Sequence, residues 1–144
     1  MSRILIVDDD EAIRDLLKEL LAGGGGHLID GAADGEEALK KISARPYDLI
    51  VLDKNMPGLS GIETLSRLRK LPNAKGARVI MCTAADSLGD VDEALTAGAD
   101  DYISKPIDSK RLAEKAAKWA AASTVPADAP GGLGGLVGRL FGPK

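Results

Sequence analysis

Short apolar runs alternate along the chain with longer stretches in which apolar residues recur every three or four positions. The short runs are rich in Ile, Val and Leu and predict strands, while the longer stretches have the spacing of one helix face. The expected strands are Arg3 to Val7, His27 to Ala32, Asp48 to Leu52, Ala77 to Cys82 and Asp101 to Ser104. The expected helices are Ala12 to Leu21, Gly35 to Ala44, Leu59 to Leu71, Leu88 to Ala97 and Ser109 to about Ala122. The pattern is therefore strand then helix, five times over.

Each helix should turn its apolar stripe toward a common core. The first is expected to bury Ala12, Ile13, Leu16, Leu17, Leu20 and Leu21, and the last to face a sheet with Leu112, Ala116 and Trp119. Glycine is unfavourable inside helices, so the first helix should end at the run Gly23 to Gly26, and Gly98 should end the fourth.

Strands joined by helices predict a parallel sheet, because parallel neighbours need long crossover connections. The run Asp48 to Leu52 is apolar enough to be buried on both faces, which places it at the sheet centre. In such α/β folds the ligand site lies beyond the carboxyl ends of the strands, at a topological switch point. A functional site is therefore expected at that edge.

Composition narrows the class of protein. With 144 residues, 44% hydrophobic and 28% charged, the chain fits one globular domain with a single core. Its net charge of −3 provides no basic excess and disfavours direct binding to nucleic acid. The single cysteine, Cys82, excludes an internal disulfide and is expected in the core. No aliphatic run approaches the ~18 residues of a membrane span or the ~7 of a signal core, so we expect a soluble cytoplasmic protein.

Polar residues gather after the expected strands: Asp8, Asp9 and Asp10 after the first, Asp53 and Asn55 after the third, Thr83 after the fourth and Lys105 after the fifth. Carboxylates at contact distance repel by about 4 kcal/mol per pair at an effective dielectric near 20, so they need a counter-charge. Mg²⁺ prefers such oxygen ligands, and the absence of His and Cys from this set disfavours zinc. Ionised Asp8, Asp9 and Asp53 would carry −3, which Mg²⁺ and Lys105 together would neutralise.

Four motifs in order, "ILIVDDDEAIR", "DLIVLDKNMPGLSG", "CTA" and "GADDYISKP", resemble the receiver domains of two-component response regulators, the CheY-like family. The resemblance covers residues 2 to about 122. It implies a flavodoxin-like (βα)5 three-layer sandwich with a five-stranded parallel sheet in the order 2-1-3-4-5. This order comes from the resemblance, not from the alternation of strands and helices.

The resemblance also implies roles for the acidic residues. Asp53 matches the phosphoacceptor, and Asp8 with Asp9 match the acidic pair that binds Mg²⁺ together with Asp53. Asn55 would contribute its backbone carbonyl to the metal. Asp10 is predicted to cap the following helix, with a ligand role as the alternative.

Three further positions match the family beyond the acidic cluster. Thr83 matches the hydroxyl residue that contacts the phosphoryl group, Lys105 the lysine that neutralises it, and Tyr102 the aromatic switch residue. Lys54, which follows the phosphoacceptor, is expected to be a surface charge only.

The function implied is a single-domain response regulator that accepts a phosphoryl group from a histidine kinase or a phosphotransfer protein. It would bind a downstream protein through the face around Tyr102 and the last helix. Such a protein catalyses its own phosphorylation, with self-catalysed dephosphorylation left open, and is not a metabolic enzyme. Two alternatives remain: a receiver-like scaffold that is never phosphorylated, and a Mg²⁺-dependent aspartyl-phosphate hydrolase. Hydrolases of this kind have a second Asp two residues after the nucleophile, and this chain has Asn55 at that position, which disfavours the hydrolase.

Composition changes after about residue 122, which predicts a receiver domain over 1–122 and a Pro/Gly-rich tail over 123–144. The tail is interpreted as disordered. The alternative is a tethered docking segment, because Leu133, Leu136, Val137, Leu140 and Phe141 are too apolar for a pure spacer.

Overall fold

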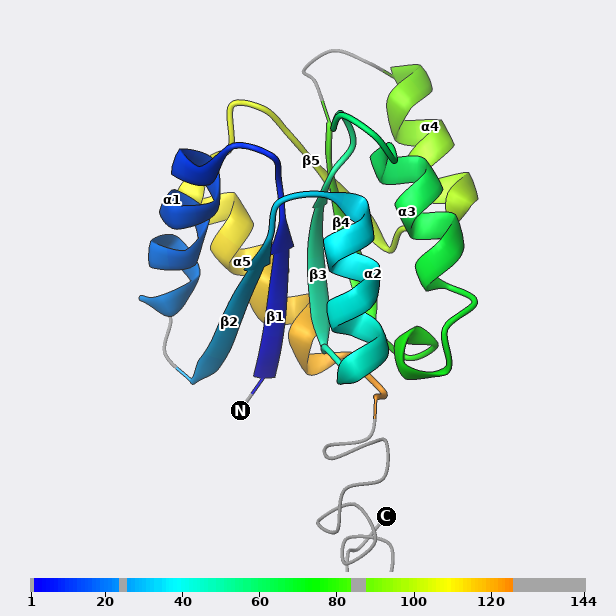
Figure 1. Ribbon diagram of the computed structural model, residues 1–144. Coiled ribbons are helices and arrows are strands. Elements are labelled where there is room, and N and C mark those ends of the chain that lie inside the picture. The colour runs from blue at the N-terminus through cyan, green and yellow to red at the C-terminus, as the bar shows by residue number, and fades with distance from the viewer. Residues whose placement is uncertain (1, 24–25, 84–87, 126–144) are drawn as a thin grey trace, which may run out of the picture.

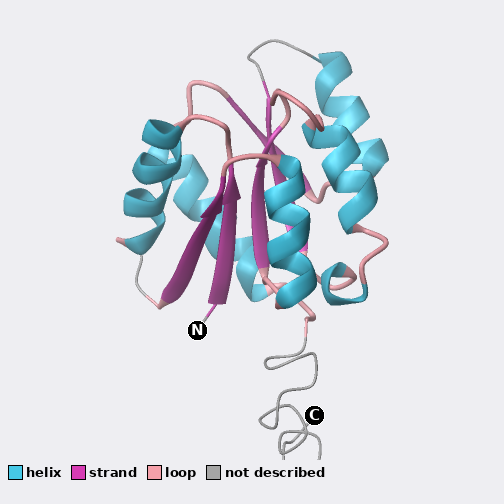
Figure 2. Cartoon of the chain, in the orientation of Figure 1, coloured by secondary structure: helices cyan, strands magenta, loops and turns pink. Residues whose placement is uncertain are grey.

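A parallel sheet lies between two layers of helices in the computed structural model, which describes residues 2–23, 26–83 and 88–125 (Figures 1 and 2). The elements in chain order are β1 (Ser2–Val7), α1 (Glu11–Ala22), β2 (His27–Ala32), α2 (Gly35–Ala44), β3 (Leu49–Asp53), α3 (Gly61–Leu68), the 3₁₀ turn η1 (Pro72–Ala74), β4 (Arg78–Thr83), α4 (Leu88–Ala97), β5 (Asp101–Ser104) and α5 (Ser109–Ala121). This series confirms the alternation that the apolar pattern predicts.

The strand order is β2-β1-β3-β4-β5, and every neighbouring pair is parallel. The flavodoxin-like order implied by the family resemblance is thereby confirmed. In the observed register Val7 lies opposite Leu52, and Asp53 lies opposite Cys82. The carboxyl ends of β1, β3 and β4 therefore lie at the same edge of the sheet, and each strand ends one residue beyond the preceding one in this order.

The core is divided by the sheet because strand side chains alternate between its faces. On one face Ile50 and Leu52 pack with buried residues of α2, α3 and α4, and on the other Leu49 and Val51 pack with those of α1 and α5. Figure 1 shows the same division, with α1 and α5 on one side of the sheet and α2, α3 and α4 on the other. All five residues of β3 are buried, which confirms that this strand is the centre of the sheet.

The third helix is shorter than predicted, because local signals define both of its ends. Ser60 accepts a hydrogen bond from the Glu63 backbone while the Glu63 side chain accepts one from the Ser60 backbone, so the helix begins at Gly61 and not at Leu59. It ends at Leu68. Pro72 disfavours a helical conformation at the residue before it, and Leu71 is extended. The prediction of one helix from Leu59 to Leu71 is therefore wrong at both ends.

Three side chains lie differently from the predicted stripes. Ala12 and Leu16 were expected in the core, but Ala12 is exposed and Leu16 is 50% exposed on α1. Trp119 packs against the α1 and α5 side of the core only from its periphery, because its indole Nε1 donates to Asp101 at 2.9 Å. The third strand also starts one residue later than predicted, at Leu49, and the Asp48 carboxylate before it accepts a hydrogen bond from the Arg3 backbone.

The described chain ends at the edge of the sheet opposite to the acidic strand ends. Thr124 donates its backbone N–H to the Gly76 carbonyl at 3.1 Å, and Arg78 at the start of β4 donates to the Ala122 carbonyl. A side chain at Gly76 would collide with Thr124, so glycine permits this close approach. The predicted tail over residues 126–144, and the choice between spacer and docking segment, lie outside the described residues.

In the part of the chain that the structure describes, none of the helices has the length and apolar character needed to cross a membrane.

Candidate functional site

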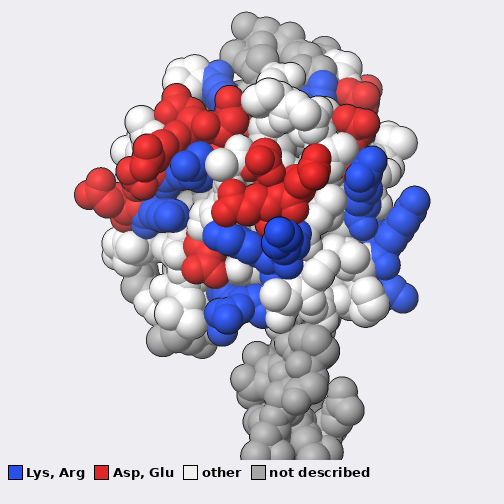
Figure 3. Space-filling model, viewed as in Figure 1, with Lys and Arg blue, Asp and Glu red and all other residues white. Residues whose placement is uncertain are grey.

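Three carboxylates meet at the carboxyl edge of the sheet. Oxygen atoms of Asp8, Asp9 and Asp53 all lie within 4.8 Å of one another. Asp8 and Asp53 are each only 3% exposed, whereas Asp9 is exposed. Figure 3 shows that acidic side chains gather on the upper half of the viewed face, the half in which the strands end in Figure 1. The structure therefore brings together the three acidic residues that the sequence pattern singled out.

Asp8 is held by the chain around it. Its carboxylate accepts the Asp10 backbone N–H at 2.9 Å, and its backbone carbonyl accepts a hydrogen bond from the Arg14 guanidinium at 2.7 Å. Burial raises the pKa of Asp8, and the neighbouring charge of Asp53 raises it further, although the Asp10 N–H opposes both effects. Burial and the neighbouring carboxylate thus disfavour the charged form of Asp8, and a cation beside it would favour that form.

Asp10 belongs to the helix and not to the acidic cluster. Its carboxylate accepts the backbone N–H groups of Ala12 and Ile13, at 2.9 and 3.4 Å, which are the free donors of the first turn of α1. The predicted capping role is confirmed.

Lys105 supplies one positive charge to the cluster. Its Nζ lies 3.0 Å from Asp53 Oδ1 and 3.7 Å from Asp8 Oδ2. Burial alone would lower the pKa of Lys105, but the hydrogen bond to Asp53 and the charges of both carboxylates raise it overall. The Lys105 backbone N–H also donates to the Thr83 carbonyl at 2.8 Å, which fixes this residue directly after β5. Lys105 therefore stays protonated and positively charged at the site.

The loop after β3 folds back tightly over Asp53. The Asn55 backbone N–H donates to Asp53 Oδ1 at 3.2 Å. The backbone of Asn55, whose carbonyl is the expected metal ligand, therefore lies beside the acidic cluster. Gly61 at the start of α3 donates to the Lys54 carbonyl at 2.8 Å, and a Cβ at that position would come within 2.6 Å of the Lys54 Cα. Glycine at this turn thus allows α3 to start directly against the end of β3.

Thr83 and Tyr102 lie on neighbouring strands and on the same face of the sheet. Met81 is opposite Tyr102 and Thr83 is opposite Ser104, so strand alternation puts the Thr83 and Tyr102 side chains on one side. Thr83 is completely buried, and its Oγ1 has no hydrogen-bond partner among the residues that the structure describes. Tyr102 is 37% exposed at the edge strand. A buried hydroxyl without a partner is costly, which points to a ligand that would satisfy it.

Two residues near the site were missed or misjudged from the sequence. Arg14, whose guanidinium holds the Asp8 carbonyl, gives no signal in the sequence beyond its place in an amphipathic helix. Lys54 was expected to be a surface charge, but its side chain is only 12% exposed and pairs with Glu93 of α4 at 3.0 Å. Neither contact could be found from spacing, because both depend on how distant elements pack.

The residues present fit a magnesium ion. Three ionised carboxylates and one ammonium sum to −3 + 1 = −2, the charge that one divalent cation neutralises. All the clustered side-chain ligands are oxygens, as a hard cation prefers. Cys82 lies on the neighbouring strand, but burial raises its pKa to about 12 and the side chain is 2% exposed, so it is a neutral core thiol and no soft ligand. The predicted core position of Cys82 is confirmed.

Known proteins share this arrangement. The response regulator receiver domain model matches residues 4–117. The chain is 39% identical over 123 residues to the two-component response regulator ORR41 of Oryza sativa, covering 83% of this chain and 94% of that protein. It is 44% identical over 110 residues to the uncharacterized transcriptional regulatory protein YrkP of Bacillus subtilis, covering 76% of this chain and 46% of YrkP, so it spans about half the length of that relative. The solved receiver domain of the sensor histidine kinase PA1611 from Pseudomonas aeruginosa, with magnesium coordinated in its active site cleft, is 28% identical with a TM-score of 0.76, covering 83% of this chain and 98% of that one.

Proposed function

The chain belongs to the response regulator receiver domain family, and from this membership we propose that it is a signalling switch phosphorylated on Asp53. The observation that carries the proposal is the meeting of Asp53 with Asp8, Asp9 and Lys105 at one edge of the sheet. The phosphodonor is a histidine kinase or a phosphotransfer protein, as in a two-component phosphorelay.

The reaction requires one new bond and one broken bond. An oxygen of the Asp53 carboxylate attacks the phosphorus of a phosphohistidine on the donor. The phosphorus–nitrogen bond breaks, and its electron pair stays on the imidazole nitrogen of the donor. The product is an aspartyl phosphate. Because phosphoryl transfer depends mainly on positioning and on charge stabilisation, a fixed carboxylate with cations beside it is sufficient protein chemistry.

The residues around Asp53 supply that stabilisation. Lys105 already lies 3.0 Å from Asp53 Oδ1 and would pair with an oxygen of the incoming phosphoryl group. Mg²⁺, held by Asp8, Asp9, Asp53 and the backbone carbonyl of Asn55, would supply the remaining positive charge for the phosphoryl oxygens.

Thr83 and Tyr102 form the output of the proposed switch. The unpartnered Thr83 Oγ1 is a hydroxyl donor for a phosphoryl oxygen. Its inward movement would vacate space on the face that Tyr102 shares, so the added charge changes the surface around Tyr102 and α5. A downstream protein that reads this surface would bind differently before and after phosphorylation.

The proposal extends to the organisation of the chain. Residues 1–122 act as the receiver unit, and residues 123–144 form the separate tail predicted from composition. The protein works in the cytoplasm as a signalling component and is not a metabolic enzyme. The name of ORR41, a two-component response regulator that this chain covers almost completely, supports a receiver acting through other proteins.

Acetyl phosphate with Mg²⁺ tests the phosphoacceptor. The wild-type protein should gain one phosphoryl group in its intact mass, and hydroxylamine should remove it, because acyl phosphates react with that nucleophile. Asp53→Asn should gain none, whereas Asp15→Asn, which changes an exposed carboxylate of α1, should behave as wild type. Labelling of Asp53→Asn to the wild-type extent would mean that another residue is the phosphoacceptor, and no labelling of folded wild-type protein would favour the unphosphorylated scaffold.

A further inference from the structure

Lys54 connects the proposed phosphoacceptor to a distant helix. Its Nζ lies 3.0 Å from Glu93 Oε1 on α4. Its main chain is fixed on both sides, because Lys54 N–H donates to the Cys82 carbonyl at 2.9 Å and the Lys54 carbonyl accepts from Gly61 at 2.8 Å. The side chain therefore extends from rigid backbone directly beside Asp53.

The direction of the Lys54 side chain follows from strand alternation. Ile50 and Leu52 pack on the face covered by α2, α3 and α4, and Lys54 is the next residue in that series. It points away from the acidic cluster and toward α4. Its 12% exposure shows that the pair is partly buried, although Glu93 itself is 54% exposed.

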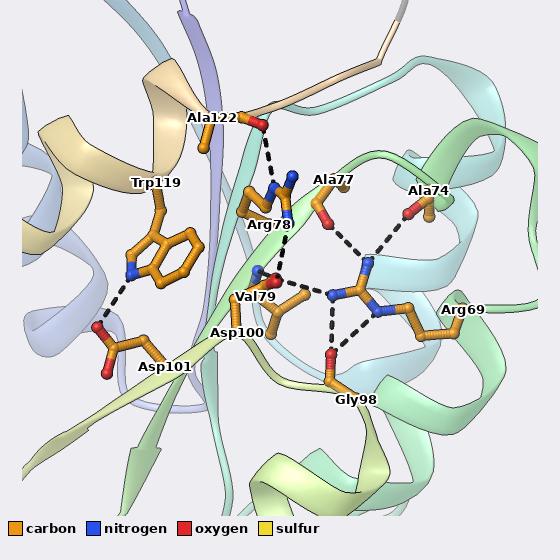
Figure 4. A network of polar contacts seen from close by, with 10 residues as sticks. All are labelled: Arg69, Ala74, Ala77, Arg78, Val79, Gly98, Asp100, Asp101, Trp119 and Ala122. Carbon is orange, nitrogen blue, oxygen red and sulfur yellow. Dashed lines mark hydrogen bonds and ion pairs between the residues drawn. The ribbon is translucent and has the colours of Figure 1, made fainter.

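The other end of α4 is fixed by a polar network (Figure 4). The Arg69 guanidinium donates to the carbonyl of Gly98, directly after α4, at 3.2 Å from Nε and 2.9 Å from Nη2. Arg69 also pairs with Asp100 at 3.0 Å, and Asp100 accepts the Val79 N–H at 2.8 Å and pairs with Arg78 at 3.2 Å. The C-terminal end of α4 is thus joined to α3 and to β4.

We propose that the Lys54–Glu93 ion pair holds α4 in its resting position and opposes the switch. This inference rests on the proposed function, in which Thr83 moves toward a phosphoryl group. Only four residues of the sequence separate Thr83 from the start of α4, so such a movement would displace the start of the helix while the Arg69 network retains its end. A tilt of α4 about Gly98 changes the distance between Glu93 and the fixed backbone of Lys54. A contact made only in the resting state stabilises only that state, so its removal shifts the population toward the active state.

Beryllofluoride with Mg²⁺, a mimic of the phosphoryl group, measures this population shift. The apparent Kd for beryllofluoride is followed through the amide NMR signals of Asp53 and Thr83. Because partly exposed ion pairs contribute modestly, Glu93→Gln should bind about two- to fivefold more tightly than wild type. Asp92→Asn, which removes the same charge from a neighbouring exposed position of α4, should match wild type.

Glu93→Gln is also introduced into Lys54→Gln protein, which tests whether loss of the Lys54–Glu93 ion pair itself tightens beryllofluoride binding. In Lys54→Gln protein the partner is already absent, so adding Glu93→Gln should leave the apparent Kd unchanged. Urea unfolding of each variant is measured alongside. A merely structural pair would lower the free energy of unfolding of Glu93→Gln without tightening beryllofluoride binding.

The possible failures are distinct. If wild type binds but Glu93→Gln binds equally well, or if Glu93→Gln tightens binding in the Lys54→Gln background too, the pair does not restrain the switch and the inference is overturned. If wild-type signals do not respond to beryllofluoride at all, the proposed function fails and this inference fails with it.

Discussion

At the scale of single residues, the Thr83 hydroxyl carries a signature that a purely structural residue would lack. It is buried and has no hydrogen-bond partner within the described part of the chain, so in the unmodified protein it costs free energy. A buried threonine with a structural role would normally satisfy its hydroxyl with a backbone carbonyl, as Thr64 of α3 does with Ser60 at 2.8 Å.

Thr83→Val therefore separates the two roles. Valine keeps the shape and removes the unsatisfied donor, so the free energy of unfolding should be unchanged or rise, by up to about 1–3 kcal/mol. Beryllofluoride binding should weaken, because the phosphoryl mimic loses a hydrogen bond. Thr83→Ser is the matched control that keeps the donor. A valine variant that is less stable and binds beryllofluoride normally would show that Thr83 serves only the fold.

Most residues of the proposed site could be predicted from the sequence because each one lies at the carboxyl end of a strand or within two residues after it. Asp8, Asp9, Asp53, Thr83 and Lys105 need only a correct strand end and the rule that parallel strands share an edge. The Lys54–Glu93 pair could not be predicted, since 38 intervening residues have to pack before these side chains meet.

At the scale of elements, β5 and α5 are joined by one carboxylate. Asp101 accepts hydrogen bonds from Lys115 Nζ and from Trp119 Nε1, each at 2.9 Å. The same Lys115 Nζ lies 5.6 Å from the centre of the Tyr102 ring. The hydrogen bonds of Asp101 therefore position α5 against the surface around Tyr102, which the proposed partner would bind.

The contribution of the Asp101 carboxylate should appear in the pH dependence of the free energy of unfolding. Burial would raise the pKa of Asp101, but the hydrogen bonds from Lys115, Trp119 and the Tyr102 backbone lower it overall. A pKa that is lower in the folded state gives stability above the ordinary value of 3.8, and this stability is lost as the pH falls through the folded value. Asp101→Asn should thus lose about 1 kcal/mol of unfolding free energy near pH 7.

Urea unfolding at a series of pH values checks the sign. The difference between wild type and Asp101→Asn should shrink as the pH falls from about 4 through the lowered pKa of folded Asp101, where the wild-type carboxyl is protonated and loses its charge. Asp92→Asn, at an exposed position of α4, controls for the change in net charge. A difference that stays constant across the series would mean that the charge of Asp101 does not stabilise the fold.

The ends of the elements show where pattern analysis stops. Apolar periodicity located every strand and all five α-helices of the described residues, but it extended α3 through Leu71. The Ser60 cap and Pro72 act on the backbone and not on hydrophobicity, so periodicity cannot detect them. Leu16 was misplaced for a related reason: α1 buries a narrower stripe, with Leu17 and Leu21 inward, than its apolar residues suggest.

At the scale of the whole molecule, alternation of strands and helices predicted a covered parallel sheet but not its strand order. Five strands can be arranged in many orders with the same local patterns, and the order 2-1-3-4-5 came from the family motifs. That order places β1 beside β3, which brings Asp8 and Asp53 to one point. The described chain ends at the opposite edge, against Gly76, so the tail begins away from the acidic cluster.

The central claim is that distant carboxylates meet to hold a magnesium ion beside the phosphoacceptor, and calorimetric titration of Mg²⁺ tests it most directly. Wild-type protein should bind one Mg²⁺ per chain at millimolar concentration. Asp9→Asn, which changes an exposed ligand and leaves the fold intact, should bind at least about tenfold more weakly. Asp10→Asn keeps the helix cap and should match wild type. No heat of binding to wild type, or equal affinity for wild type and Asp9→Asn, would contradict the account.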